Sequence, residues 1–273
     1  MSILVVGSVA LDSVRTPFGE VKEALGGSAT YFSTAASFFA DVRVVAVVGE
    51  DFPEEHLAFL RSRSIDLRGL KRVPGRTFRW TGAYGFDLND AQTLETQLNV
   101  FAEFHPDIPE AYRESELVFL ANIDPDLQRE VLAQVRSPKL VAADTMNFWI
   151  DRKPESLRET LRSVNMLLIN DAEVRQLAKE PNLVRAARTI LDWGPTSLVI
   201  KRGEYGALMV REGGWFAAPA IPLDSVFDPT GAGDCFAGGF IGYLANTMNF
   251  EETNVRKAIV MGSVMASFNV EAF

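Results

Sequence analysis

The stretch that decides the fold is Asp228-Pro229-Thr230-Gly231-Ala232-Gly233-Asp234-Cys235-Phe236-Ala237-Gly238-Gly239-Phe240, in the last quarter of the chain. The small residues at 231–233 let the backbone bend sharply and bring its amides close to a ligand. An apolar helical pattern follows over 236–244. Free amides at the start of that helix, together with the helix dipole, predict a site for an anion.

Asp234 lies in the first turn of this predicted helix and has two interpretations. It could cap the helix, because aspartate is favoured at helix starts. Alternatively, it could be a general base next to a bound phosphate. A cap does not require Gly-Ala-Gly in front of it, so the glycine context favours the general base.

Short apolar runs elsewhere in the chain alternate with helical patterns. The runs have little polar alternation, which is typical of strands covered on both faces. The predicted strands are 3–6, 42–48, 117–120, 140–143, 166–169 and 198–200. The predicted helices are 28–39, 54–62, 126–135, 154–164, 172–179, 183–193 and 255–268. Such alternation predicts an α/β protein with a mainly parallel sheet and helices on both sides.

Two segments depart from this alternation. Residues 77–101 are rich in aromatic and β-branched residues, and residues 12–25 are short and half polar. We expect both to form antiparallel strands outside the main layer, as a small β-sheet lid on a single domain spanning 1–273. Phe78, Trp80, Tyr84 and Phe86 would give this lid an apolar face, which could also pair two lids in a homodimer. Residues 207–218 predict a hairpin that turns at 213–214.

Composition excludes several classes of protein. The 273 residues carry 27 Lys+Arg against 36 Asp+Glu, a formal net charge of −9, which disfavours binding to nucleic acid or to anionic membranes. A single cysteine, Cys235, allows neither a disulfide within the chain nor a thiolate zinc site. No apolar run is long enough to span a bilayer. The N-terminus reads as a buried strand and not as a signal peptide, so we expect a cytoplasmic protein.

Five elements, in order along nearly the whole chain, resemble a known family. The sequence at 228–234 resembles the second signature of the ribokinase-like (PfkB) carbohydrate and nucleoside kinases, and Gly26-Gly27-Ser28-Ala29-Thr30-Tyr31 resembles their first. Gly7-Ser8 with Asp12 is similar to the family's sugar-binding strand end. Residues 170–173 resemble its Asn-x-x-Glu element, and 201–206 resemble its nucleotide-binding strand end.

This resemblance implies a three-layer α/β/α domain with a β lid, and transfer of the γ-phosphoryl group of ATP to a hydroxyl. The residue matching Asp234 takes the hydroxyl proton. The amides matching Gly231, Ala232 and Gly233 form an anion hole, which agrees with the need to stabilise charge on the phosphoryl oxygens.

Candidate acceptor-binding residues lie near strand ends and glycine turns. By resemblance, Gly26 and Gly27 contact the substrate where lid meets core, although they could simply form a loop-to-helix turn. Asp12 follows the first predicted strand, where its carboxylate could bind paired hydroxyls or stabilise a turn. Tyr31 stands where many members carry asparagine, and its ring could pack on a base or stay in the core.

Asn122 and Asn147 also fall at strand ends, where they could contact the acceptor or cap loops.

The resemblance places the nucleotide near residues 170, 201 and 230. Asn170, Lys201, Gly203 and Thr230, together with Gly231 and Gly233, are the candidate ATP-binding residues. Lys201 stands where threonine is frequent, and it could reach a phosphate or extend toward solvent. Glu173 is expected to help hold Mg²⁺ through water, or to be a solvated first-turn glutamate. Asp228 matches a position that binds a monovalent cation such as K⁺ in some members.

The sequence therefore predicts an ATP- and Mg²⁺-dependent kinase of a small sugar or nucleoside. Tyr31 and the lid aromatics favour a nucleoside. The alternatives are a non-catalytic sugar or nucleotide sensor on the same fold, and another α/β enzyme that shares only the glycine turn. We also expect that a terminal segment follows Phe273, because family members commonly continue beyond the last predicted helix.

Overall fold

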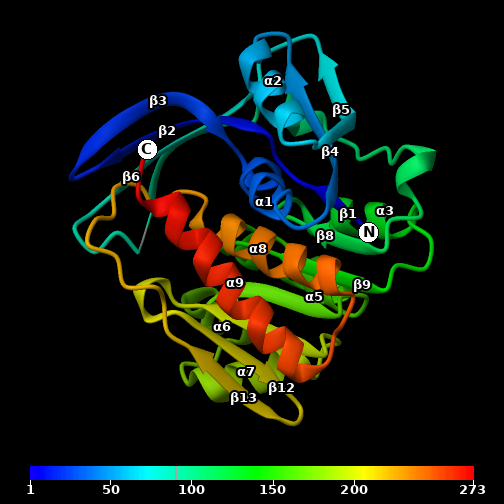
Figure 1. The fold of residues 1–273 in the computed structure, drawn as a ribbon, viewed down its shortest axis with the longest axis vertical. Coiled ribbons are helices and arrows are strands. Elements are labelled where there is room, and N and C mark those ends of the chain that lie inside the picture. The colour runs from blue at the N-terminus through cyan, green and yellow to red at the C-terminus, as the bar shows by residue number, and fades with distance from the viewer. Residues whose placement is uncertain (90) are drawn as a thin grey trace.

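A computed structural model describes residues 1–89 and 91–273. Its centre is a nine-stranded sheet in which the apolar runs pair side by side (Figure 1). In spatial order its strands are β13 (Gly214–Ala218), β12 (Ala207–Arg211), β11 (Ser197–Lys201), β10 (Met166–Asn170), β9 (Leu140–Asp144), β8 (Leu117–Leu120), β1 (Ser2–Val6), β4 (Asp41–Gly49) and β5 (Asp66–Val73). The strands from β11 to β5 pair in parallel, and β12 and β13 add an antiparallel hairpin at one edge.

Helices cover both faces of this sheet because its inward side chains are apolar on both sides. One buried cluster joins the sheet to α1 (Ser28–Ala36), α2 (Glu54–Ser62), α8 (Ala232–Thr247) and α9 (Glu252–Val270). The opposite cluster joins it to α3 (Pro125–Leu132), α4 (Asn147–Arg152), α5 (Pro154–Leu161), α6 (Asp171–Ala178) and α7 (Leu183–Leu191). The predicted three-layer α/β/α architecture is confirmed.

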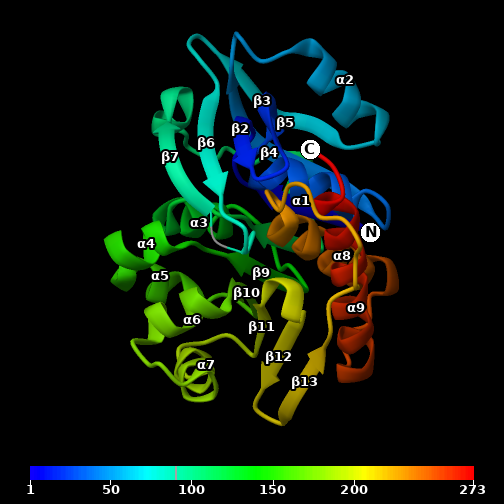
Figure 2. The ribbon, with the colours of Figure 1, turned by 90° about the vertical axis from the view of Figure 1, so that its left-hand side faces the viewer.

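A four-stranded sheet stands beside this core at the ends of the parallel strands (Figure 2). Its order is β3 (Gly19–Gly26), β2 (Ala10–Thr16), β6 (Phe78–Tyr84) and β7 (Ala91–Gln97). The prediction of purely antiparallel strands is wrong in one respect, because β2 and β6 pair in parallel. This is possible because the intervening chain passes through the core between them. Asp90, inside the predicted lid segment 77–101, lies outside the described residues.

Three further differences from the prediction have simple physical reasons. Strand β5 was not predicted, because its sequence is polar and it lies at an exposed sheet edge. Helix α4 is too short to have a readable period. The short 3₁₀ segments η1 (Asn99–Glu103), η2 (Glu110–Tyr112) and η3 (Gly203–Tyr205) also carry no such pattern.

Small residues let α8 pack closely against α1. A methyl group added at Gly238 would lie 2.4 Å from the carbonyl oxygen of Phe32 and 2.8 Å from Cβ of Ala35. The axis of α8 therefore depends on a glycine at this position. The position of α8 in turn fixes where its first turn, with Asp234, meets the sheet.

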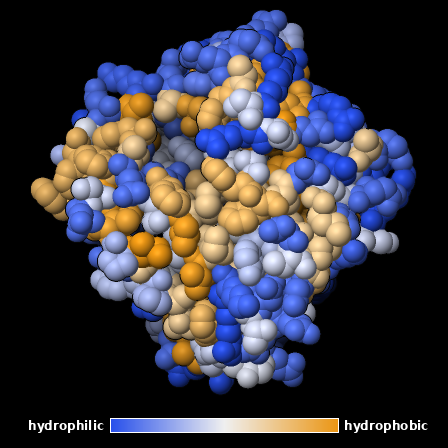
Figure 3. Space-filling view, in the orientation of Figure 1, coloured by the Kyte–Doolittle hydropathy of each residue, from blue (hydrophilic) through white to orange (hydrophobic). Residues whose placement is uncertain are grey.

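No described helix is both long and apolar enough to span a membrane. On the face of the molecule that carries α9, apolar side chains gather at the surface (Figure 3). Val260 and Phe268 of this helix are 44% and 66% exposed.

We predict that Gly238→Ala destabilises the fold by about 1–3 kcal/mol, because overpacking forces the two helices apart. Urea unfolding followed by circular dichroism measures this. Gly213→Ala is the control, because no heavy atom lies within 4 Å of the added methyl group, and we expect it to change stability by less than about 0.5 kcal/mol. Equal effects of the two substitutions would contradict the packing argument.

Candidate active site

Three neighbouring parallel strands end in polar side chains at the same edge of the sheet. β9 ends at Asp144, β10 at Asn170 and β11 at Lys201. Asn170 and Lys201 are direct neighbours in the strand register. Ligand sites of open parallel sheets lie beyond these carboxyl ends, and the structure brings the start of α8 to the same place.

The turn before α8 has a conformation that requires glycine. Gly231 has φ +76°, in the left-handed region, and a Cβ there would lie 2.4 Å from ring atoms of Tyr31. The backbone of the turn therefore lies directly against the Tyr31 ring. Asp228 stabilises the approach to this turn, because its Oδ1 accepts a hydrogen bond of 2.9 Å from the amide of Thr230.

The amides of the turn are not all available to a ligand. The Ala232 amide donates to the carbonyl of Pro229 at 3.1 Å, so the assignment of Ala232 to the anion hole is corrected. The Cys235 amide donates to the carbonyl of Gly231 at 2.8 Å. Within the described part of the chain, the amides of Gly231, Gly233 and Asp234 have no acceptor among these turn and loop bonds. These amides are the donors that an anion could use.

Asp234 is half-buried in the first turn of α8. Burial and the nearby Asp144 carboxylate raise its pKa to about 8, while Lys201 opposes the rise and Asp12 and Glu173 add to it. The carboxyl group is therefore a weak acid near neutral pH, which is the property of a general base.

Asp12 lies inside β2 of the smaller sheet and not at the end of the first core strand, as the sequence suggested. The main chain turns from β1 into the smaller sheet earlier, at 7–9. The Gly27 amide donates to Oδ2 of Asp12 at 3.2 Å, and a Cβ at Gly26 would lie 2.0 Å from the same oxygen. Burial, more than the charge of Asp228, raises the pKa of Asp12 to about 7.

Gly26 ends β3 and Gly27, with φ +94°, precedes α1. Both glycines therefore stand where the smaller sheet joins the core, as the sequence predicts.

Glu173 and Asn170 form a reciprocal helix cap. Asn170 Oδ1 accepts from the Glu173 amide at 2.8 Å, and Glu173 Oε2 accepts from the Asn170 amide at 3.0 Å. The two residues therefore form a capping box, an arrangement that the sequence analysis did not predict. Burial and the charge of Asp144 raise the pKa of Glu173 to about 7, so a divalent cation close to these carboxyl groups would be favourable.

Asp144 was missed at the sequence level. Lys201 Nζ donates to its Oδ2 at 2.8 Å, and the two side chains are 17% and 6% exposed. The sequence does contain a signal for Asp144, because it is an acidic residue directly after the apolar run 140–143.

Strand β6 of the four-stranded sheet and the loop after it cover the carboxyl ends of the parallel core strands. The hydroxyl of Thr230 is 3.3 Å from the hydroxyl of Tyr84, and a Cβ at Gly203 would lie 2.1 Å from Oδ1 of Asn89. The other predicted lid aromatics lie elsewhere: Phe78 stacks on Phe101 and Phe86 is 89% exposed.

The side chains of Asn122 and Asn147 have partners around the start of α4. Asn122 accepts from Trp149 Nε1 at 3.1 Å and donates to Met146 Sδ at 3.0 Å. Asn147 Oδ1 accepts from the amide of Phe148 at 2.8 Å, at the start of α4. These contacts match the loop-capping interpretation of the two residues.

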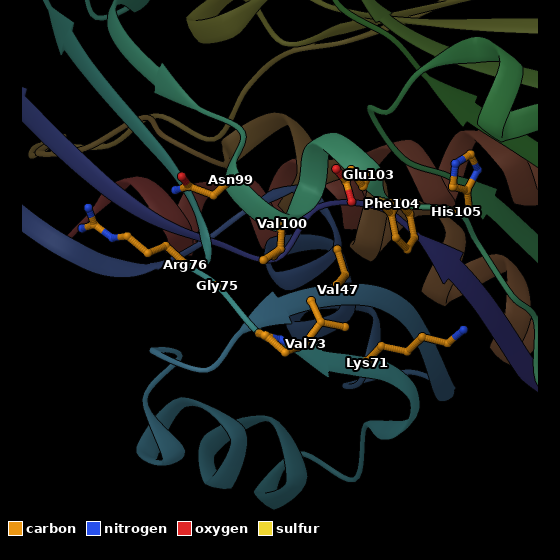
Figure 4. Close-up of a pocket in the computed structure, with 11 residues that line it drawn as sticks. Val47, Lys71, Val73, Gly75, Arg76, Asn99, Val100, Glu103, Phe104 and His105 are labelled. Carbon is orange, nitrogen blue, oxygen red and sulfur yellow. The ribbon is translucent and has the colours of Figure 1, made fainter.

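A cavity of about 710 Å³ lies between β5 and η1, apart from the site residues described above (Figure 4). Val47, Val73, Val100 and Phe104 contribute apolar lining, and none of the predicted site residues borders it. Within residues 1–89 and 91–273, no group of three or more His, Cys, Asp or Glu side chains is arranged to hold a metal ion by itself.

Comparison with known proteins gives the family of the chain. The family model described as pfkB family carbohydrate kinase matches residues 2–273. The cytidine kinase of Thermococcus kodakarensis is 30% identical over 258 residues, which are 92% of this chain and 91% of that protein.

Solved structures share the fold. The nucleoside kinase of Burkholderia thailandensis in complex with inosine has a TM-score of 0.82 at 20% identity, covering 97% of this chain and 90% of that one. A putative ribokinase II from E. coli in complex with ATP and Mg²⁺ has a TM-score of 0.80 at 17% identity, covering 99% and 92%.

We predict that Asp12→Asn stabilises the protein at pH 8 and has little effect at pH 4. The folded-state pKa of Asp12 is raised to about 7, so its ionisation weakens the fold as pH rises from the unfolded-state value through 7. The gain at pH 8 should be on the order of a few kcal/mol.

Asp66→Asn is the control of opposite sign. Hydrogen bonds from Arg68 hold the pKa of Asp66 at about 2, so its ionised form stabilises the fold and the substitution should destabilise it at pH 8. Thermal unfolding at the two pH values measures both effects. A loss of stability for Asp12→Asn at pH 8 would contradict the burial of an unpaired charge.

Proposed function

The chain belongs to the pfkB family of carbohydrate kinases, and from this we propose that it transfers the γ-phosphoryl group of ATP to a hydroxyl group of a nucleoside. Membership makes it a phosphotransferase with an alcohol group as acceptor, in the class of sugar and nucleoside kinases, as the sequence predicts. The observation that carries the residue assignments is the half-buried Asp234 carboxyl next to the amides of Gly231, Gly233 and Asp234, which have no acceptor among the turn and loop bonds of the described residues.

Asp234 is the proposed base. It accepts the proton of the attacking hydroxyl, and a base within hydrogen-bond reach typically contributes about 10²–10⁴-fold. At neutral pH the carboxyl, with its pKa raised to about 8, holds its own proton in much of the free protein. A positive charge that arrives with the nucleotide would favour the ionised form.

The turn at 231–233 is the proposed anion hole, with Gly231, Gly233 and the Asp234 amide as donors. These donors are fixed before the reaction, so charge on the transferred phosphoryl oxygens is stabilised without reorganisation. Thr230, Asn170, Lys201 and Gly203 would hold ATP along the same edge. ATP with Mg²⁺ supplies the transferable phosphoryl group and part of the charge neutralisation.

Glu173 is suited to orient Mg²⁺ through water, because the charge of Asp144 acts on it and, within residues 1–89 and 91–273, no lysine or arginine forms an ion pair with it. The backbone amides of Asn170 and Asn147 both donate to its carboxyl group and hold that group in place. Asp228, buried next to Thr230, is the proposed contact for a monovalent cation.

The acceptor would bind between the smaller sheet and the core. Asp12 would accept hydrogen bonds from paired hydroxyls, with Gly26 and Gly27 giving the substrate close access to the backbone. The ring of Tyr31 lies against Gly231, so an aromatic acceptor could stack close to the turn. This ring and the cytidine kinase relative favour a nucleoside over a plain sugar.

Tyr84 contacts Thr230 and Asn89 lies close to Gly203, which supports a lid formed by β6 and the loop after it. We propose that this lid opens to admit ligands and excludes water when closed, since water would compete as acceptor. A non-catalytic sensor would not need the half-buried Asp234 carboxyl, whose raised pKa weakens the fold at neutral pH. A loss of stability at such a group is the usual cost of an active site.

A matched acceptor panel tests the substrate class. The protein is incubated with ATP, Mg²⁺ and either cytidine, adenosine and inosine or ribose and fructose, and ADP release is followed. We expect turnover with at least one nucleoside at a higher kcat/KM than with any sugar. Saturable nucleoside binding without ADP release would support the sensor instead.

Asp234→Asn tests the base. We predict a loss of about 10²–10⁴-fold in kcat with ATP affinity retained. Asp171→Asn is the matched control, because Asp171 is likewise a first-turn aspartate but pairs with Arg175 at 2.7 Å on α6; it should keep normal turnover. Near-normal turnover by Asp234→Asn would contradict the assignment.

The pH dependence gives an independent test. The free protein should gain kcat/KM for ATP as pH rises from 6 and level off above about 8, where Asp234 is ionised. A profile that is flat between pH 6 and 8 would be inconsistent with a base of raised pKa.

A further inference from the structure

The buried ion pair Lys201–Asp144 lies next to the catalytic turn. Its Nζ to Oδ2 distance is 2.8 Å, and both side chains are mostly inaccessible to solvent. Buried ion pairs add little stability compared with apolar residues of the same size. The position of the pair therefore needs an explanation other than stability.

Lys201 contacts the turn as well as Asp144. A Cβ built at Gly233 would lie 3.0 Å from Nζ of Lys201, so the ammonium group already lies against the backbone whose amides face the proposed phosphoryl group. Glycine at 233 is what leaves room for it. A small movement of the four-carbon side chain would carry its charge from Asp144 to an anion at the turn.

The charges around Lys201 are unbalanced. The carboxyl groups of Asp144, Glu173 and Asp234 all act on Lys201, and together they raise its pKa although burial lowers it. The lysine therefore keeps its proton. Three carboxyl groups with one lysine would repel a polyphosphate unless that lysine turned toward it.

We propose that Lys201 changes partners: it is held by Asp144 in the free protein and donates to the terminal phosphate of the nucleotide in the complex. Asp144 acts as a positioning residue that keeps the lysine at the turn and competes with the phosphate for it. This inference rests on the proposed function, because it requires ATP at the 231–233 turn.

Nucleotide binding tests the exchange without any turnover. ATP and ADP affinities are measured by calorimetry for the unsubstituted protein, Lys201→Met and Asp144→Asn. Lys201→Met should weaken ATP binding about 10- to 100-fold, as expected for a lost charged hydrogen bond, and ADP binding much less. Asp144→Asn should leave ATP binding as tight or make it tighter, because a competing partner is lost.

A purely structural ion pair gives a different pattern. Both substitutions would then weaken ATP and ADP binding to a similar degree, and this result would overturn the proposal. Lys153→Met is the matched control, because Lys153 pairs with Asp124 and Asp126 at 2.6 Å but is not part of the proposed site. It should bind both nucleotides normally.

Two further measurements keep the test decisive. Lys201→Met could unfold the protein by leaving Asp144 unpaired, so Lys201→Met/Asp144→Leu, which removes both charges, is measured alongside. It should fold and still discriminate poorly between ATP and ADP. Normal discrimination by the folded double variant would overturn the proposal.

The pH profile of kcat/KM supplies a second readout. Lys201 lowers the pKa of Asp234 and Asp144 raises it, with Asp12 and Glu173 unchanged in both variants. Lys201→Met should therefore shift the profile to higher pH, and Asp144→Asn should shift it to lower pH. Shifts of the two profiles in the same direction would contradict the placement of Lys201 and Asp144 next to Asp234, on which the exchange depends.

The outcome separates the two proposals. If the unsubstituted protein binds ATP with the predicted pattern but phosphorylates no acceptor, the exchange stands and the proposed kinase reaction fails. If turnover is robust but Lys201→Met discriminates ATP from ADP normally, the reaction stands and the exchange fails. Absence of ATP binding to the unsubstituted protein would overturn both.

Discussion

The rest of the site depends on the contact between the backbone at Gly231 and the ring of Tyr31. No side chain fits between them, since a Cβ would lie 2.4 Å from the ring, and the left-handed φ of +76° also favours glycine. This contact joins α1 to the start of α8 and so fixes the height of Asp234 above the sheet. The close packing of Gly238 on Phe32 holds the same two helices together about two turns further along.

Asp234, Glu173 and Asp12 then share a region of restricted solvent access, where burial is the main cause of their raised pKa values and the charge of Asp144 adds to the rise for Asp234 and Glu173. The pKa values of Asp12, Glu173 and Asp234 rise to about 7, 7 and 8. Holding these carboxyl groups away from water and close to other carboxylates costs stability at neutral pH, and a cationic or hydrogen-bonding ligand would offset that cost. Mg²⁺ with a nucleotide and a polyhydroxyl acceptor would do so from opposite sides of the turn.

Much of the fold could be predicted from the sequence because its core strands are short apolar runs bounded by polar residues. The six predicted core strands match β1, β4, β8, β9, β10 and β11 to within one or two residues. Strand β5 has the sequence of a surface segment, and its pairing is decided by the neighbouring β4. The parallel pairing of β2 and β6 depends on contacts between residues far apart in the chain, which local periodicity does not report.

The residues of the site also fall into those that the local sequence predicts and those that it does not. The glycine turn could be predicted because only glycine tolerates its backbone. The partner of Lys201 could not, because Asp144 is 57 residues away in the chain and meets it only through the strand order. The engaged amide of Ala232 likewise depends on the exact geometry of the turn. Asn122 and Asn147 have the residue type and the position of ligand contacts, but in this structure their side-chain oxygens accept hydrogen bonds from residues of α4.

The central claim is that the Asp234 carboxylate receives the acceptor's proton. A crystal structure with a non-hydrolysable ATP analogue, Mg²⁺ and a nucleoside that the protein phosphorylates would test it most directly. The account predicts an oxygen of Asp234 within about 2.6–3.2 Å of the attacking hydroxyl, with the terminal phosphate against the amides of Gly231 and Gly233. A hydroxyl held by another side chain, with Asp234 turned away from it, would contradict the account.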